Sequence, residues 1–357
     1  MKKNKNKILV TGGAGFIGSN FISYHINNTE NLILNLDKMT YAGCQLSLES
    51  FAKNPNYTFV RGDICNKKLV EEVLKKFKPD YIVNFAAESH VDRSIENPMS
   101  FIKSNVEGIT NLLLCSMNYF DGLNTSLQNK FKFLHISTDE VYGSLDFNDS
   151  PFKESDKYDP SSPYSSSKAS SDLIVKSWFK TYRFPVFITN CSNNFGPFQF
   201  PEKLIPLMII NALNEKQLPV YGSGKNIRDW IHVYDHCDAI IKIIEKGKIG
   251  EKYNIGGNCE LQNIDIVNKI CSILDKSKPR QDGIPYSKLI EFVEDRPGHD
   301  YRYAVNIEKI STLLGWEPKV EFEVGIRETI NWYIENYDWW EKIINKKYKL
   351  ERLGKKK

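Results

Sequence analysis

The 357-residue chain lacks most of the features that would link it to a metal, an oxidising compartment or a membrane. Its seven cysteines are scattered and form no Cys-x-x-Cys pair, which argues against a zinc site and a disulfide framework. The basic N-terminus lacks the apolar core and cleavage site of a signal peptide. The longest strongly apolar stretch, around 204–213, is far shorter than a membrane span and contains Pro206. We therefore expect reduced thiols, a cytoplasmic location and no membrane partner.

A large excess of one charge is also missing. Lys and Arg total 48 against 44 Asp and Glu, and much of the resulting charge of +4 lies in the lysine-rich ends. No basic stretch interleaved with aromatics occurs inside the chain, so a nucleic-acid partner is not expected. The 41% of hydrophobic residues are ample for a core, so the sequence predicts a globular protein.

Short apolar runs alternate with longer helix-like stretches over the first half of the chain. The predicted strands are 7–10, 32–37, 57–60, 81–87, 131–137 and 186–190. Strands separated by helices favour an α/β fold with a Rossmann-type, doubly wound parallel sheet. After about residue 195 the rhythm becomes irregular, and helical patterns follow near 234–246 and 262–276 and, rich in aromatics, around 326–343.

This change of rhythm predicts two lobes. We expect an NAD-binding domain over 1–190, with parts of 225–260 interleaved, and a smaller mixed α/β substrate-binding lobe over 191–345. A basic tail should follow over 346–357.

A glycine-rich turn follows the first predicted strand. Gly12, Gly15 and Gly18 lie where the chain enters an apolar helix, and Asp37 ends the second strand nineteen residues after Gly18. Glycines there let a pyrophosphate approach the helix N-terminus, and the carboxylate suits ribose hydroxyls and repels a 2′-phosphate. The pattern predicts an NAD site. Asp63, at the end of the third strand, could contact the adenine or form a strand-end turn.

Tyr164 and Lys168 lie four residues apart on a predicted helix that Pro163 would start. A tyrosine base working near neutrality needs a pKa roughly 3 units below its usual value of about 10. A neighbouring ammonium and a positive nicotinamide ring could supply that shift. A surface pair is the alternative, but behind a dinucleotide fold a catalytic pair is favoured.

Thr138, Asp139 and Glu140 follow the fifth strand in the stretch FLHISTDEVYG. Alone, they fit a helix cap as well as an active site. If all three face one substrate, the chain must leave strand geometry at 138, because strict alternation would turn Asp139 away.

Longer blocks resemble one family. AAESHVDRSI (86–95), STDEVYG (137–143), YSSSKASSD (164–172), CSNNFGPFQFPEKLIPL (191–207), YGSGKNIRDWIHVYDH (221–236) and EDRPGHDYRY (294–303) are similar to the nucleotide-sugar 4,6-dehydratases of the extended short-chain dehydrogenase/reductase superfamily. The resemblance implies tightly bound NAD+ that is regenerated each turnover, a nucleoside-diphosphate sugar substrate and a homodimer. The thymidine type fits most closely, with a uridine nucleotide as the alternative. A 4-epimerase or decarboxylase of the same superfamily, and a non-catalytic NAD-sensing or scaffold protein, are further alternatives.

The resemblance also implies site residues. As catalytic groups it gives Thr138, Asp139 as general acid, Glu140 as base, Tyr164 and Lys168. The cofactor contacts would be Gly12, Gly15, Phe16, Ile17, Gly18, Asp37, Lys38, Thr40, Asp63, Ile64, Ala86, Ala87, Tyr164 and Lys168. The substrate contacts would be Ser89, Asn193, Glu202, Lys203, Leu204, Tyr221, Arg228, Asn263, Arg296 and His299.

Two of these regions have plainer explanations. Arg228 could instead form an ion pair with the adjacent Asp229 or a nearby carboxylate. His232 and His236 are four residues apart, but no third ligand accompanies them, so no metal is expected. For the dimer, the segment 100–120 and the helix after Tyr164 resemble the helices that pair across the family's interface, although plain core is the alternative.

Overall fold

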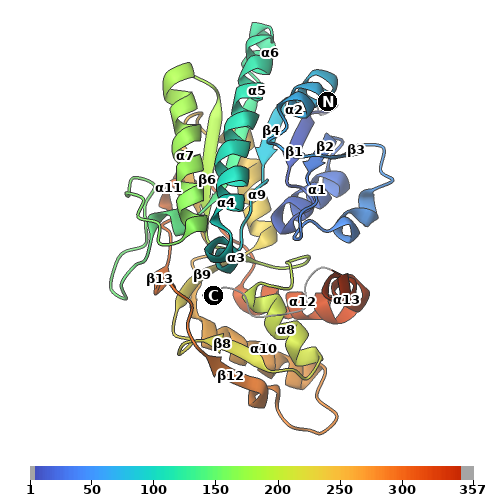
Figure 1. The fold of residues 1–357 in the computed structure, drawn as a ribbon, viewed down its shortest axis with the longest axis vertical. Coiled ribbons are helices and arrows are strands. Elements are labelled where there is room, and N and C mark those ends of the chain that lie inside the picture. The colour runs from blue at the N-terminus through green and yellow to red at the C-terminus, as the bar shows by residue number, and fades with distance from the viewer. Residues whose placement is uncertain (1–4, 347–357) are drawn as a thin grey trace.

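The computed structural model describes residues 5–346 and is built around a seven-stranded sheet (Figure 1). The strand order is β10-β6-β5-β4-β1-β2-β3, and all neighbouring pairs are parallel. These strands are β1 (Lys7–Thr11), β2 (Leu32–Asp37), β3 (Tyr57–Arg61), β4 (Tyr81–Asn84), β5 (Lys132–Thr138), β6 (Val186–Cys191) and β10 (Lys252–Ile255). The predicted doubly wound parallel sheet is confirmed.

Helices cover both faces of this sheet. On one face lie α1 (Phe16–Asn28), α9 (Val233–Lys246) and α11 (Glu308–Leu314), whose apolar side chains share a core with β1, β6 and β10. The other face carries α2 (Lys67–Phe77), α5 (Ile109–Asp121) and α7 (Pro163–Tyr182). Shorter elements on the way are η1 (Gln45–Phe51), α3 (Val91–Glu96), α4 (Pro98–Phe101), the π-helix η2 (Ile102–Gly108), α6 (Thr125–Gln128) and η3 (Asp139–Tyr142).

A second set of elements surrounds its own core below the sheet (Figure 1). Its strands are β7 (Asn193–Phe195), β8 (Leu218–Tyr221), β9 (Ile227–His232), β11 (Glu260–Gln262), β12 (Ile290–Val293) and β13 (Arg302–Tyr303). Its helices are α8 (Leu204–Leu213), α10 (Asn263–Ser277), η4 (Tyr286–Leu289), α12 (Phe322–Glu335) and α13 (Tyr337–Lys346). The predicted basic tail lies, after Lys346, outside the described residues.

The C-terminal helical region differs from the single helix expected over 326–343. Asn336 ends α12 and donates its side-chain amide to the Trp332 carbonyl at 2.8 Å. Trp339 then starts a new turn by donating its backbone N–H to the Asn336 carbonyl at 3.1 Å. The break lets Trp339 and Trp340 pack into the core at 7% and 1% exposure.

The helix that carries the predicted catalytic pair starts with strong local signals. Ser162 caps α7 through a capping box with Ser165, and Pro163 occupies the first helical turn. Tyr164 and Lys168 are consequently fixed in the first two turns, where both are buried.

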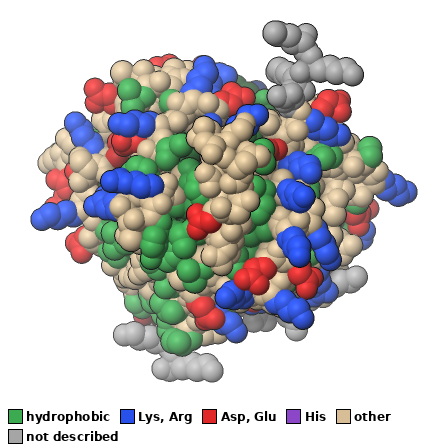
Figure 2. Space-filling model, turned by 90° about the horizontal axis from the view of Figure 1, so that it is seen from above, with side chains coloured by type: hydrophobic (Ala, Val, Ile, Leu, Met, Phe, Trp, Pro, Cys, Tyr) green, Lys and Arg blue, Asp and Glu red, His purple; other side chains and the backbone are tan. Residues whose placement is uncertain are grey.

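One end of the molecule carries an apolar surface. Seen from the end at which α5, α6 and α7 rise in Figure 1, hydrophobic side chains gather near the middle of the visible face (Figure 2). Large hydrophobic residues that remain exposed on α5 and α7 are Leu114, Leu173 and Tyr182. Tyr182 lies nine residues after Leu173 and therefore on the opposite side of α7, so we call only Leu114 and Leu173 the α5/α7 patch.

Candidate active site

A cavity of about 290 Å³ opens at the carboxyl ends of the parallel strands. It is lined by the turn after β1 and by the ends of β2, β4, β5 and β6. Ligands of open α/β sheets bind at this edge. All fourteen residues predicted to contact the cofactor and all five predicted catalytic residues line this one cavity.

The glycine turn has the geometry that a dinucleotide requires. Gly12 has a φ of +73°, and a Cβ there would lie 2.5 Å from the Ala86 nitrogen, so only glycine fits. A Cβ on Gly18 would lie 2.6 Å from the Gly12 carbonyl oxygen. The turn can therefore pack against β4 and leave the N-terminus of α1 open to the cavity.

Asp37 is held in place at the end of β2. Its two carboxylate oxygens accept the backbone N–H groups of Ala14 at 2.9 Å and Met39 at 2.7 Å. Asp63 forms the strand-end turn by accepting the Cys65 N–H, and it also lines the cavity, so its contact with the adenine stays a prediction. Its second oxygen pairs with Lys38 Nζ at 2.8 Å. Together, the glycine turn and these carboxylates fit the adenosine half of NAD.

The chain leaves strand geometry at Thr138, as the sequence argument required. η3 begins at Asp139, and Thr138 caps it by accepting the Glu140 N–H at its Oγ1, at 3.3 Å. The Thr138 hydroxyl donates to Asp139 Oδ1 at 3.2 Å. The cap and the cavity wall are therefore made by the same three residues, so the capping explanation and the active-site explanation are compatible.

The two carboxyl groups of η3 differ from ordinary surface acids. Burial, and then the charge of Glu140, raise the pKa of Asp139 well above its usual value. Burial also raises the pKa of Glu140, whereas Arg296, Lys203 and Arg228 lower it. Asp139 is thus suited to hold a proton, while Glu140 faces three cations that favour its carboxylate.

Tyr164 and Lys168 are also deeply buried. Burial, followed by the charges of Glu140 and Cys191, raises the pKa of Tyr164 well above 10, and a hydrogen bond with Thr138 opposes this. Burial lowers the pKa of Lys168 to about 8. Its ammonium donates to the Ile136 carbonyl at 2.8 Å. Without a bound positive charge the phenol strongly prefers to keep its proton.

The predicted substrate residues fall into two groups. Ser89, Asn193, Glu202 and Lys203 line the cavity. The remaining six, which belong to the second lobe and lie outside that lining, are Leu204, Tyr221, Arg228, Asn263, Arg296 and His299. Arg228 and Arg296 nevertheless lie close enough to Glu140 to affect its pKa.

In the described part of the chain, Arg228 does not form the ion pair with Asp229 or a nearby carboxylate that the sequence left open. It donates to the carbonyls of Ile227, at 2.7 Å, and Asp300, at 2.9 Å, while its guanidinium lies 4.3 Å from the Tyr303 ring centre. Asp229 instead accepts the backbone N–H groups of Gly257 and Cys259. Within residues 5–346 no ion pair of Arg228 is found, so its charge is available to an anion.

A pair of residues that sequence reasoning did not single out connects the two lobes. Asp92 of α3 accepts from Arg296 Nη1 at 3.0 Å and from the Tyr221 hydroxyl at 3.2 Å. The adjacent Arg93 pairs with Glu202 at 3.0 Å. Asp92 and Arg93 both lie in the block AAESHVDRSI. Their role in joining the two lobes is recognised only from their partners, which are far away in the sequence.

His232 and His236 do not converge on a metal site. The His236 Nδ1 lies 2.9 Å from Asn194 Oδ1, and His232 caps α9. Over the described range, no group of three or more His, Cys, Asp or Glu residues could hold a metal ion.

Comparison with known proteins identifies the family. The model of the GDP-mannose 4,6 dehydratase family matches residues 9–329, most of the chain. This chain belongs to the GDP-mannose 4,6 dehydratase family. It is 51% identical over 350 residues to a dTDP-glucose 4,6-dehydratase of Neisseria meningitidis, with 98% of this chain and 99% of that protein covered.

Solved structures agree with this family membership. The crystal structure of dTDP-glucose 4,6-dehydratase from Bacillus anthracis in complex with NAD is 47% identical, with a TM-score of 0.84, and 95% of this chain and 99% of that chain are covered. DesIV, the dTDP-glucose 4,6-dehydratase of Streptomyces venezuelae with NAD and TYD bound, is 41% identical, with a TM-score of 0.86 and coverage of 94% and 99%. The expected dehydratase fold of this family member is confirmed.

Proposed function

We propose that this chain catalyses the 4,6-dehydration of dTDP-glucose to dTDP-4-keto-6-deoxyglucose with bound NAD+. The observation that carries the proposal is the position of Asp139 and Glu140 beside Thr138, Tyr164 and Lys168 in one cavity. Related 4-epimerases move a hydride without eliminating water, so they do not need this added acid and base. The similarity to dTDP-glucose 4,6-dehydratases supports the same conclusion.

The order of steps follows from the chemistry of the sugar. The C5 proton of glucose is not acidic until C4 has become a ketone, so C4 must be oxidised first. Tyr164 removes the proton of the 4-hydroxyl, with Thr138 hydrogen-bonded beside it and Lys168 favouring the phenolate. Bound NAD+ supplies a hydride acceptor for C4, a hydride donor for C6 and a positive ring charge that lowers the pKa of Tyr164.

Elimination of water then needs both carboxyl groups. Glu140 removes the C5 proton, and Asp139 protonates the C6 oxygen, because hydroxide is a poor leaving group. The raised pKa of Asp139 keeps a proton available for this step. Glu140 returns a proton to C5 when C6 is reduced, so the product is a 4-keto-6-deoxy sugar.

The second lobe would bind the nucleoside diphosphate. Arg228, Arg296 and Lys203 provide the cations for the diphosphate, because guanidinium groups offer forked donors to phosphate oxygens. Ser89, Asn193, Glu202, Leu204, Tyr221, Asn263 and His299 remain proposed substrate contacts. In the same proposal residues 1–190, with parts of 225–260, form the NAD-binding domain, and 191–345 form most of the substrate lobe.

Assembly and location belong to the same proposal. We infer a homodimer through α5 and α7, which the α5/α7 patch supports. No helix in the described part of the chain is long and apolar enough to cross a membrane. A cytoplasmic location is proposed on the sequence grounds given above.

The decisive experiment gives the purified protein dTDP-glucose and UDP-glucose in parallel, without added NAD, and follows the 4-keto-6-deoxy product. Turnover of dTDP-glucose with the higher kcat/KM is expected. A higher kcat/KM for UDP-glucose would reassign the nucleotide, since one buried methyl contributes only about 0.8 kcal/mol. If neither substrate reacts even with NAD added, while other nucleotide sugars are epimerised or decarboxylated, the dehydratase proposal is wrong.

A further inference from the structure

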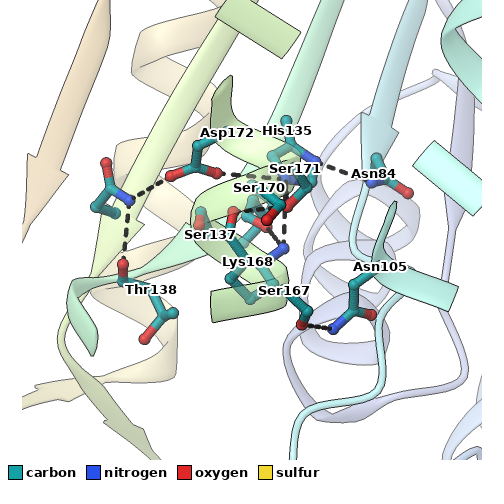
Figure 3. A network of polar contacts seen from close by, with 12 residues as sticks. Asn84, Asn105, His135, Ser137, Thr138, Ser167, Lys168, Ser170, Ser171 and Asp172 are labelled. Atoms are coloured by element: carbon teal, nitrogen blue, oxygen red, sulfur yellow. Dashed lines mark hydrogen bonds and ion pairs between the residues drawn. The ribbon is translucent and has the colours of Figure 1, made fainter. Parts of the chain in front are cut away.

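A buried polar row that the mechanism above does not use lies behind Lys168 (Figure 3). Thr11, Asn84 and His135 occupy paired positions on β1, β4 and β5, and each is at most 1% exposed. The Thr11 hydroxyl contacts Asn84 Oδ1 at 2.5 Å, and Asn84 Nδ2 lies 3.0 Å from His135 Nδ1. Burying polar groups in the middle of a sheet costs free energy, so a row this complete suggests a specific task.

The row ends at the catalytic lysine. His135 Nε2 lies 3.3 Å from Lys168 Nζ, and Lys168 is 3% exposed. The Ile136 carbonyl is the other acceptor of this ammonium, and within residues 5–346 Lys168 takes part in no ion pair. Asp172 raises the pKa of Lys168 without pairing with its ammonium, so the buried ammonium also depends on its hydrogen-bond acceptors to remain charged.

The tautomer of His135 determines whether it can be such an acceptor. A lysine ammonium can only donate, so His135 must present an unprotonated Nε2 and carry its single proton on Nδ1. This tautomer requires that the side-chain oxygen of Asn84, rather than its side-chain nitrogen, lies next to Nδ1. A 180° rotation of the side-chain amide exchanges the two atoms. With the amide nitrogen there instead, the ring proton lies on Nε2 and is directed to Ser171 Oγ at 3.2 Å.

The ring carries a single proton, and its neighbours at Nε2 are Lys168, Ser171 and Asp172. Burial lowers the pKa of His135 well below 6.5, so the ring is neutral at working pH. The Ser171 hydroxyl donates to the Lys168 carbonyl at 2.7 Å, and Asp172 Oδ1 lies 3.5 Å from His135 Nε2, so both of these oxygens can accept a proton from Nε2 in the opposite tautomer. The Lys168 ammonium is the contact that requires the acceptor form, because it can only donate.

We propose that His135 is a positioning residue for Lys168, whose ammonium it accepts at Nε2 and thereby holds charged beside Tyr164. This inference rests on the proposed roles of Tyr164 and Lys168 in C4 oxidation. Asn84 sets the ring tautomer and Thr11 orients Asn84, so three strands together fix one ammonium. His135 does not touch the substrate and acts through the lysine alone.

The expected consequence appears on the alkaline side of the pH profile. The titratable groups that face Lys168 are Tyr164 and Asp172 on its own helix, His135 on β5 and Cys191 on β6. Asp172 and Cys191 raise the pKa of Lys168, and burial lowers it. If His135 is replaced by an apolar residue, the charged lysine loses one of its two acceptors, so its pKa should fall and activity should be lost at a lower pH.

The test measures kcat and KM for dTDP-glucose against pH in His135→Leu, His135→Gln and the wild type. In His135→Leu, kcat should fall about 10- to 100-fold, the effect of one lost hydrogen bond to a charged group, with KM within about threefold. The alkaline limit should move down by about one pH unit. His135→Gln, whose amide oxygen can accept from Lys168, should recover most of both losses.

Ser167→Ala is the matched control. Ser167 is a buried serine in the same helix that bonds Asn105 at 2.8 Å instead of Lys168, so its profile should match that of the wild type. An unchanged alkaline limit in folded His135→Leu, or a Gln variant no better than Leu, would overturn the proposal.

A second measurement does not depend on folding of the variants. ¹⁵N spectra of the histidine-labelled wild type at pH 7 should show His135 neutral, with its proton on Nδ1. A proton on Nε2, or a doubly protonated ring, rejects the positioning role. If the wild type itself does not convert dTDP-glucose, the proposed function fails, whereas an active wild type with the wrong tautomer rejects the His135 inference alone.

Discussion

At the scale of single residues, the proposed mechanism divides elimination between Asp139 as the acid and Glu140 as the base. Asp139→Asn should slow release of water about 10²- to 10⁴-fold, since that is the usual contribution of one general acid. C4 oxidation should remain measurable, because it depends on Tyr164. Rapid-quench analysis with NADH absorbance separates the two steps, and equal loss of both would contradict the role given to Asp139.

Glu140→Gln is the companion variant, since Gln and Asn keep the size of Glu and Asp but can act neither as a general acid nor as a general base. Exchange of the substrate C5 hydrogen with solvent should fall sharply in Glu140→Gln, while it persists in Asp139→Asn. Undiminished exchange would rule out Glu140 as the base. The different environments of the two carboxyl groups, one beside Thr138 and the other facing three cations, are the structural basis for this division.

At the scale of elements, α3 holds the second lobe against the sheet. Asp92→Asn removes the charge that pairs with Arg296, a proposed diphosphate contact, so KM for the nucleotide sugar should rise about tenfold while kcat changes little. Steady-state kinetics with dTDP-glucose measure both constants.

Asp282→Asn is the matched control. Asp282 also pairs with an arginine of this lobe, Arg280, but at the surface, and its replacement should leave KM unchanged. Equal effects of the two variants would contradict a specific role for α3.

The structure of α9 predicts a pH dependence of stability. His236 is fully buried, and burial lowers its pKa to about 3. The unfolded chain binds a proton at this residue below about pH 6.5, whereas the folded chain does not. Stability is therefore lost as pH falls from 6.5 toward 3. His236→Gln should reduce the slope of unfolding free energy against pH, between pH 6 and 5, by about 1.4 kcal/mol per unit. Urea unfolding at both pH values tests this, and an unchanged slope would contradict it.

Local sequence signals predicted the elements and the cavity well, and long-range pairs poorly. The glycine turn, the strand that ends at Thr138 and the helix start at Pro163 are each specified by neighbours in sequence, so the residues that line this part of the cavity could be named in advance. The pairs Asp92–Arg296 and Arg93–Glu202 join residues 204 and 109 positions apart, for which no periodicity gives a signal. The helix break at Asn336 was missed for a similar reason, because burial of Trp339 and Trp340 by the second lobe outweighs the continuous helical pattern.

At the scale of the whole molecule, the α5/α7 patch provides the test of assembly. Leu173 on α7 is 59% exposed and Leu114 on the neighbouring α5 is 43% exposed. Apolar side chains gathered on two adjacent helices favour a helix-to-helix interface between copies of this chain, because their burial removes apolar area from water. The same helix α7 carries Tyr164 and Lys168, so association would also stabilise the helix that holds the proposed catalytic pair.

Leu173→Glu should therefore convert a dimer into a monomer. Sedimentation velocity should give the wild type a mass near twice the chain mass of 41.2 kDa, and the variant a mass near that of one chain, because a buried unpaired carboxylate strongly disfavours the interface. Leu313→Glu is the control, since Leu313 on α11 is equally exposed, at 60%, and lies outside the patch. A wild type that sediments as a monomer would reject this interface, and a Leu173→Glu variant that stays dimeric would show that the contact is elsewhere. Loss of the dimer in the Leu313→Glu control as well would show that the effect is not specific to the patch. Because the variant keeps every residue of the cavity, any fall in kcat that accompanies dissociation measures how far the dimer supports α7.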